Sequence, residues 1–176
     1  MRVFLAFLRK TDWLMVAIIF LLITIGLVII YSIGKNSEIP STAGFYKQLI
    51  SAGIGLILFI VCIFISTRFL KSYAFIFYIL GILLLIIVLF FGVEIGGTKG
   101  WLSVAGFTIQ PIEISRVCLI LFLAQFFSRK SAELDKMKNI LISGLIMIPY
   151  IVLVLLQPDL GSVVILLLIW LAIIFN

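Results

Sequence analysis

Six long apolar runs dominate this sequence and constrain its fold more than any other feature. An α-helix needs about 20 apolar residues to cross the hydrocarbon core of a bilayer. Charged residues are nearly absent from the first three runs, and the last three runs are shorter, near the lower end of the spanning range. The runs cover approximately residues 14–33, 46–66, 73–92, 111–127, 140–156 and 160–175.

Composition excludes a soluble globular protein. With 65% hydrophobic and 11% charged residues, the chain carries more apolar surface than a soluble domain of 176 residues could bury. We therefore predict an all-α, polytopic integral membrane protein with six transmembrane helices in one transmembrane domain over residues 1–176. The first run is longer than the apolar region of a typical signal peptide and lacks a small-residue cleavage site, so we expect it to stay in the mature protein.

The basic residues predict the orientation of these helices. Cytoplasmic loops of membrane proteins carry an excess of Lys and Arg. One set of alternate loops, which includes the N-terminal segment, holds Arg2, Arg9, Lys10, Arg68, Lys71, Arg129, Lys130, Lys136 and Lys138. The opposite side holds only Lys35, Lys47 and Lys99. We therefore place the N-terminus in the cytoplasm, and the loop 93–110 and the turn 157–159 on the outer side.

The same asymmetry explains the net charge of +6 without nucleic acid as a partner. The chain has no His and two Cys, which makes a metal site built from His or Cys implausible. Cys62 and Cys118 are expected at different depths in the membrane, so we predict no disulfide and interpret both as buried filling residues. Gln125, deep in the fourth run, is expected to form a hydrogen bond between helices.

Two similar segments read as helix starts on the outer side. In Gln110-Pro111-Ile112-Glu113, Pro suits the first helical position and the acid of the first turn suits the helix dipole. Arg116 follows three residues after Glu113 and shares its face, just below the outer surface where solvation is poor. Gln157-Pro158-Asp159 repeats this order, with an acid expected in the first turn. Purely structural roles, as helix caps and as an internal ion pair, are the alternative for all three charged residues.

A glycine-rich stretch precedes the first of these starts. Gly96 and Gly97 are followed by Lys99, Gly100 and Trp101, and we expect a flexible loop. A cation beside a large ring suits an anionic ligand that is partly apolar or carries sugars. Anchoring at the membrane interface is the alternative role of Trp101, since Trp is enriched there.

Taken together, these segments resemble the SEDS family (shape, elongation, division and sporulation), to which RodA and FtsW belong. The segment that begins at Gln110 matches the family motif Gln-Pro-Ser-Glu-x-x-Lys, with Ile112 in place of Ser and Arg116 in place of Lys. The segment that begins at Gln157 matches the family motif Gln-Pro-Asp-Leu-Gly-Thr/Ser. Asp12-Trp13 favours the RodA branch. The resemblance rests on Thr11-Asp12-Trp13-Leu14 with Gly26 and Ile30-Tyr31-Ser32, on Gln110-Pro111-Ile112-Glu113-Ile114-Ser115-Arg116, on Gln157-Pro158-Asp159-Leu160-Gly161-Ser162, and on Gly97-Thr98-Lys99-Gly100-Trp101-Leu102.

The resemblance implies the N-terminal part of a ten-helix peptidoglycan glycosyltransferase. Such an enzyme polymerises lipid II at the outer face of the bacterial cytoplasmic membrane for cell-wall elongation and rod shape, with a class B penicillin-binding protein as partner. The aspartate considered catalytic in the family is expected beyond Asn176, so no catalytic residue is assigned here. A divalent cation can assist at the diphosphate, but no carboxylate pair identifies a metal site. The candidate substrate-binding residues are Lys99, Trp101, Gln110, Glu113, Arg116, Gln157 and Asp159.

Two other functions stay open from the sequence. A lipid II flippase or other transporter would favour a polar path through the whole bilayer, whereas the charges expected within the membrane lie in its outer third. This distribution favours chemistry at the surface. A noncatalytic membrane scaffold of a cell-wall synthesis complex is the third possibility.

Overall fold

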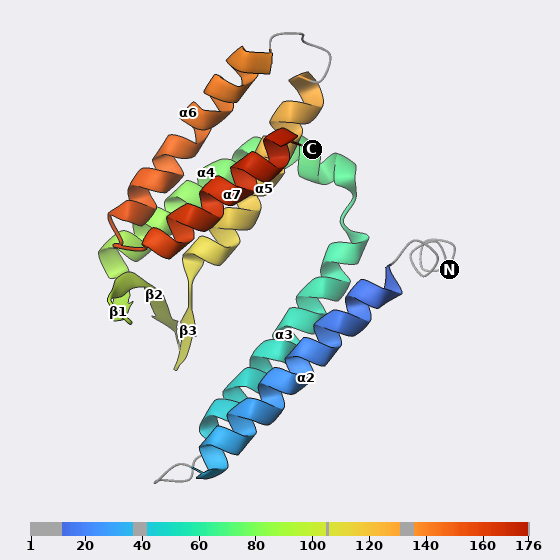
Figure 1. Ribbon diagram of the computed structural model, residues 1–176, viewed down its shortest axis with the longest axis vertical. Coiled ribbons are helices and arrows are strands. Elements are labelled where there is room, and N and C mark those ends of the chain that lie inside the picture. Colours follow the sequence, from blue (N-terminus) through green and yellow to red (C-terminus); the bar gives the residue numbers. More distant parts are fainter. Residues whose placement is uncertain (1–11, 37–41, 105, 131–135, 176) are drawn as a thin grey trace. The chain divides into compact units, whose positions relative to one another are not determined.

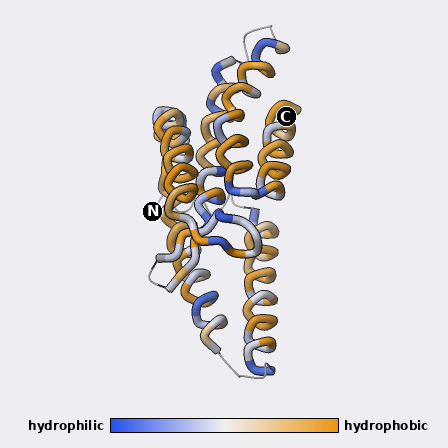
Figure 2. The backbone as a smooth tube through the Cα atoms, turned by 90° about the vertical axis from the view of Figure 1, so that its left-hand side faces the viewer, coloured by the Kyte–Doolittle hydropathy of each residue, from blue (hydrophilic) through white to orange (hydrophobic). Residues whose placement is uncertain are grey.

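The protein folds into two compact units, Met1–Ser66 and Thr67–Asn176. The structure, a computed structural model, describes residues 12–36, 42–104, 106–130 and 136–175. In these residues five helices are long and apolar enough to cross a membrane, and a sixth apolar helix is shorter. The apolar residues fill the helices, while hydrophilic residues gather at helix ends and in connections (Figure 2). The predicted all-α, multi-pass fold is confirmed. The prediction that residues 1–176 form one transmembrane domain depends on how the two units pack together, and it stays a prediction.

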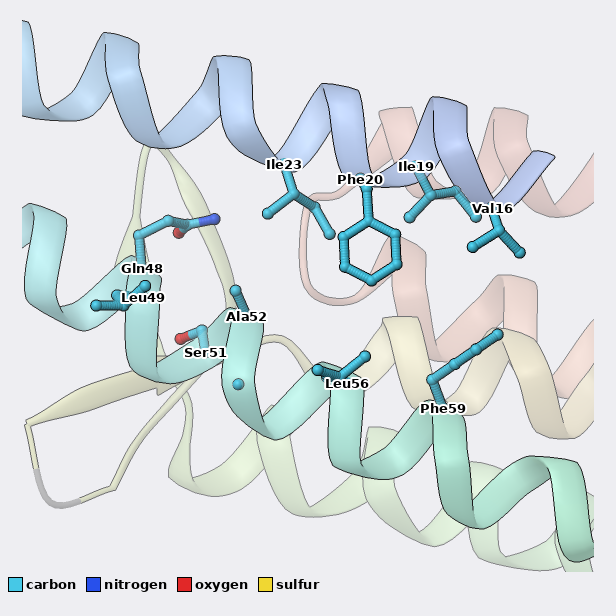
Figure 3. A pocket seen from close by; sticks show the side chains of 12 residues that line it. Val16, Ile19, Phe20, Ile23, Gln48, Leu49, Ser51, Ala52, Leu56 and Phe59 are labelled. Atoms are coloured by element: carbon cyan, nitrogen blue, oxygen red, sulfur yellow. The ribbon is translucent and has the colours of Figure 1, made fainter. Parts of the chain in front are cut away.

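The first unit is a pair of antiparallel helices, α2 (Trp13–Asn36) and α3 (Ala43–Phe64). Asp12 caps α2, because its Oδ1 accepts hydrogen bonds from the backbone N–H groups of Leu14 and Met15 at 3.0 and 3.2 Å. An apolar cavity of about 620 Å³ lies between the two helices (Figure 3). Ile19 and Phe20 line it on the α2 side, and side chains of α3 line the other side.

The second unit packs four helices side by side with a small sheet at one end (Figure 1). The helices are α4 (Thr67–Phe91), α5 (Pro111–Lys130), α6 (Lys136–Leu155) and α7 (Leu160–Phe175). The buried residues that form its core come from all four: Tyr78, Leu85, Ile112, Leu119, Leu123, Met147, Tyr150, Val154 and Leu166.

Polar side chains join α4, α5 and α6 inside this core. The Tyr150 hydroxyl donates a hydrogen bond to the carbonyl of Tyr78 at 2.9 Å, and the Tyr78 hydroxyl donates to the carbonyl of Ile146 at 2.9 Å. The Ser115 hydroxyl donates to the carbonyl of Gly81 at 3.0 Å. Because hydrocarbon offers no competing partner, such bonds hold membrane helices together. The predicted role of Gln125 is confirmed, since its Nε2 donates to a carbonyl of α4.

The sheet contains three short antiparallel strands in the order β1-β2-β3. They are β1 (Val93–Ile95), β2 (Thr98–Val104) and β3 (Phe107–Ile109). Gly96 and Gly97 join β1 to β2 with φ values of 62° and 82°, as a two-residue hairpin of type I′ requires. The expected loop is therefore largely a pair of hairpins, because its glycines supply the positive φ of a tight turn.

The observed helices follow the apolar runs closely, but several extend beyond them. Helix α4 begins at Thr67, so Arg68 and Lys71 lie in its first turns and not in the connection before it. Both cysteines are free, but only Cys118 is buried. The interpretation of Cys62 as a buried filling residue is wrong, because the described part of α3 contains no buried residue.

Candidate substrate-binding surface

Helix α5 begins as its sequence predicts. Pro111 is its first residue and Glu113 lies in its first turn. The carbonyl of Gln110 accepts a hydrogen bond from the backbone N–H of Glu113 at 3.1 Å. Pro111 therefore stands where its missing N–H costs nothing, and Glu113 stands where the helix dipole favours a negative charge.

Glu113 and Arg116 form the expected ion pair. Arg116 Nη1 lies 2.8 Å from Glu113 Oε2. The two side chains differ in exposure, however, with 57% of the Glu113 side chain and 14% of the Arg116 side chain exposed. Glu113 projects outward from the first turn, so the expectation of poor solvation holds for Arg116 and not for Glu113.

Helix α7 begins differently from the prediction. Its first residue is Leu160, and no acid lies in its first turn. Asp159 precedes the helix and caps it: its Oδ1 accepts from the backbone N–H of Ser162 at 3.0 Å, and its Oδ2 accepts from the Ser162 hydroxyl at 2.6 Å. The carboxylate thus satisfies a donor that the helix start leaves open, which is the physical reason why the helix begins after Asp159, two residues later than Pro158.

Ser162 connects the two helix starts. Arg116 Nη2 lies 3.5 Å from the Ser162 hydroxyl oxygen, which itself donates to Asp159. A chain of polar contacts therefore runs from Glu113 through Arg116 and Ser162 to Asp159. Arg116 Nε is buried and has no hydrogen-bond partner among the described residues. Sequence reasoning did not include Ser162 among the site residues, although its position three residues after a capping Asp is a recognisable signal.

Gln157 joins the turn between α6 and α7 to the sheet and to α4. Its carbonyl accepts from the backbone N–H of Lys99 at 3.2 Å, and its Nε2 donates to the carbonyl of Leu85 at 3.2 Å. A Cβ added at Gly100 would lie 3.6 Å from Gln157 Oε1 and 4.0 Å from Gln110 Nε2. Both predicted glutamines thus meet β2 at Gly100.

Lys99 and Trp101 lie on either side of this buried glycine. Position 100 faces the two glutamines. The pairing of β1 and β2 is irregular here, because the two steps from Val93 to Ile95 oppose the three steps from Thr98 to Trp101. Lys99 is exposed and Trp101 is half-buried, with Trp101 paired to Val93 of β1. The exposed Lys99 is therefore the part of this strand that is most open to a ligand, with the half-buried Trp101 two residues further along.

The seven candidates do not line the cavity described above. That cavity lies in the first unit between α2 and α3, whereas every candidate belongs to the second unit. Among the described residues, no three Cys, Asp or Glu side chains gather in a way that could hold a metal ion. The candidates instead gather at the sheet end of the second unit, where Gln157 is buried and Lys99 is exposed, and their role in binding stays a prediction.

Comparison with known proteins settles the family. A sequence profile of the cell cycle protein family of FtsW, RodA and SpoVE matches residues 12–176. The chain belongs to this family. The SEDS resemblance of the motifs is thereby confirmed.

Individual relatives agree with this assignment. The chain is 31% identical to the stage V sporulation protein E of Bacillus subtilis, over 88% of this chain and 44% of that protein. It is 34% identical to the peptidoglycan glycosyltransferase RodA of Treponema pallidum, over 86% of this chain and 35% of that protein. The chain therefore spans less than half the length of these relatives.

Solved structures show the same fold. A chain of a peptidoglycan synthase complex that coordinates polymerization and crosslinking matches with a TM-score of 0.74 and 31% identity, over 90% of this chain and 45% of that one. The rod shape determining protein RodA of Thermus thermophilus matches with a TM-score of 0.68 and 30% identity, over 90% of this chain and 50% of that one. The chain thus shares its overall fold with these solved structures.

Proposed function

We propose that this chain supplies the N-terminal part of a peptidoglycan glycosyltransferase that polymerises lipid II at the outer face of the bacterial cytoplasmic membrane. Relatives that carry the same segment are named peptidoglycan glycosyltransferases. The observation that carries the proposal is the meeting of three separate segments at one end of the second unit. Gln157 bonds to Lys99, and Arg116 contacts the Ser162 hydroxyl beside Asp159.

The charges at this end suit the departing diphosphate of a lipid-linked sugar. Lys99 is exposed on the sheet, and the starts of α5 and α7 are held together by the Arg116–Ser162 contact. Cations stabilise negative charge that develops on a leaving group, whereas the starts of α5 and α7 already carry the carboxylates of Glu113 and Asp159. Because Arg116 is already bound to Glu113, Lys99 is the first cation that an arriving diphosphate meets.

Trp101 suits the remainder of such a substrate. Its ring lies half-buried two residues from Lys99 on β2 and offers a flat apolar surface. Tryptophan rings combine a large apolar area with a polar edge, which suits a sugar at a membrane interface. No base for the acceptor hydroxyl is assigned within this chain, and it comes in this proposal from another part of the protein.

A class B penicillin-binding protein is the proposed partner. The solved complex that matches this chain is a peptidoglycan synthase that coordinates polymerization and crosslinking. A divalent cation at the diphosphate is compatible with the proposal, but the described residues supply no ligand set of their own for it.

Polymerisation of purified lipid II tests the proposal. The protein that carries this segment is reconstituted in vesicles, and glycan strands are resolved by gel electrophoresis. We expect Trp101→Ala to lower the rate at least tenfold, while Trp13→Ala, an exposed tryptophan at the start of α2, leaves it unchanged. A parent protein that makes no glycan but moves lipid II between leaflets would favour a flippase, and one that does neither would favour a scaffold. A Trp101→Ala variant at the parental rate would leave only an anchoring role.

A further inference from the structure

Gln157, a buried residue, bonds to the backbone of the strand that carries Lys99 and Trp101. Gln157 is 1% exposed and lies in the turn between α6 and α7. Its backbone N–H donates to the carbonyl of Val154 at 3.0 Å, and its carbonyl accepts from the N–H of Lys99 at 3.2 Å. The end of α6 and the strand β2 are therefore joined through the backbone of a single residue.

The side chain of Gln157 extends this connection to α4. Its Nε2 donates to the carbonyl of Leu85 at 3.2 Å, in the body of α4, and its Oε1 faces Gly100 of β2. A glutamine amide is long enough to reach both partners and carries both a donor and an acceptor. Because the group is buried, losing the donor would remove this bond without a compensating one to water.

The carbonyl side of Lys99 lies close to the end of α4. A Cβ added at Gly92, directly after α4, would lie 2.9 Å from the carbonyl of Lys99 and closer still to that of Val88. The end of α4 and β2 thus approach so closely that only glycine fits at position 92. The backbone of Lys99 therefore lies between Gly92, which its carbonyl approaches closely, and Gln157, which its N–H bonds.

We propose that Gln157 is a positioning residue, which locks β2 onto the end of α4 and so sets where Lys99 and Trp101 meet the lipid-linked diphosphate. This inference rests on the proposed function. Gln157 does not touch substrate in this arrangement, because its side chain is buried behind the sheet. Its removal should therefore weaken substrate binding through disorder of β2 while the chemical step is preserved.

The variants isolate the amide group. Gln157→Met keeps the length of the side chain and removes the donor to Leu85, and Gln157→Asn keeps the amide but is too short to reach. Gln48→Met is the matched control, because Gln48 is an exposed glutamine on α3. Where the Met variant fails to accumulate in the membrane, the polar Asn variant replaces it in both measurements.

The first measurement needs no substrate. Amide hydrogen exchange of the Lys99 N–H is followed in protein reconstituted in lipid nanodiscs. We expect exchange at least tenfold faster in Gln157→Met than in the parent or in Gln48→Met, because the acceptor of this N–H loses its support on α4. Unchanged exchange in both Gln157 variants would overturn the proposal.

The second measurement is the dependence of polymerisation on lipid II concentration. We expect an apparent KM at least fivefold higher in Gln157→Met, with kcat within twofold of the parent. An active parent whose KM does not change in the variants would overturn the positioning role, even if the exchange becomes faster. A parent without polymerase activity would overturn the proposed function itself, and the exchange result would then show only a structural contact.

Discussion

Gly81 offers the sharpest test of the packing of the second unit. A Cβ added there would lie 3.0 Å from Tyr150 Cζ, closer still to its hydroxyl, and 3.2 Å from Cys118 Cβ. The position is where α4, α5 and α6 meet, and the Tyr150 hydroxyl already donates to the carbonyl of Tyr78. Gly81→Ala should therefore displace the Tyr150 ring and break this bond.

The expected magnitude follows from three contributions. Overpacking a close-packed core costs about 1–3 kcal/mol. The lost interhelical hydrogen bond adds about 0.6 kcal/mol, a typical value in a membrane. Alanine in place of glycine within a helix returns about 1 kcal/mol. The net loss is about 0.6–2.6 kcal/mol, which for a protein of this size corresponds to a midpoint of thermal unfolding lower by roughly 1–10 °C.

Thermal unfolding in a mild detergent measures this loss, with Gly26→Ala as the matched control. Gly26 also lies inside an apolar helix, but a Cβ added there has nothing within 4 Å. We expect the control to unfold at the parental temperature or slightly above it. Adding Tyr150→Phe to Gly81→Ala should recover part of the loss, because the hydroxyl that crowds the new methyl group is gone. A Gly81→Ala protein as stable as the control would refute the reasoning.

Four further predictions concern the helix starts and the orientation. Asp159→Ala should lower the stability by about 1 kcal/mol, because the cap of α7 is lost. Asp159→Asn should retain most of the parental stability, since Asn also caps helices. Equal melting curves for the two variants would contradict capping. In a background without native cysteines, Cys at position 99 should react with an impermeant thiol reagent from outside and Cys at position 136 should not; the reverse pattern would refute the orientation. A double-mutant cycle with Glu113→Gln and Arg116→Met should show a coupling of about 0.2–1 kcal/mol in the free energy of unfolding, because Glu113 is largely exposed. Strictly additive effects would mean that the pair contributes nothing to stability. Arg116→Lys should reduce polymerisation only mildly, since the charge stays, while Arg116→Met should abolish it.

The spans were predictable because the bilayer imposes one rule on them. A helix must be apolar over about 20 residues, and the sequence shows such runs directly. The beginning of α4 was less predictable, because Thr67 and Arg68 stand before the apolar run and a helix can extend beyond the bilayer. Length and polarity therefore predict a span better than they predict its first residue.

The hairpin and the helix starts show where local signals were incomplete. Gly-Gly is a common sequence of two-residue hairpin turns, so Gly96-Gly97 could have predicted the hairpin of β1 and β2. Pro111 and Pro158 follow the same residue type, yet only Pro111 begins a helix. The difference arises from Asp159, whose side chain caps α7 from outside the helix.

Contacts between segments were beyond the reach of the sequence. The proximity of Arg116 to Ser162, and of Gln157 to Leu85, depends on how the helices of the second unit pack. No periodicity or spacing encodes these pairs in a single chain. The motifs identified the residues, and only the packing shows which of them meet.

Photo-crosslinking of lipid II to the sheet tests the central claim most directly. A photoreactive amino acid replaces Lys99 on β2 or, as a control, Met137 at the exposed start of α6. The membrane-reconstituted protein is then irradiated with labelled lipid II, with and without excess unlabelled lipid II as competitor. The account predicts a competable adduct at position 99 and none at position 137. Equal labelling at both positions, or labelling at position 99 that the competitor does not reduce, would contradict a substrate site on this face of the sheet.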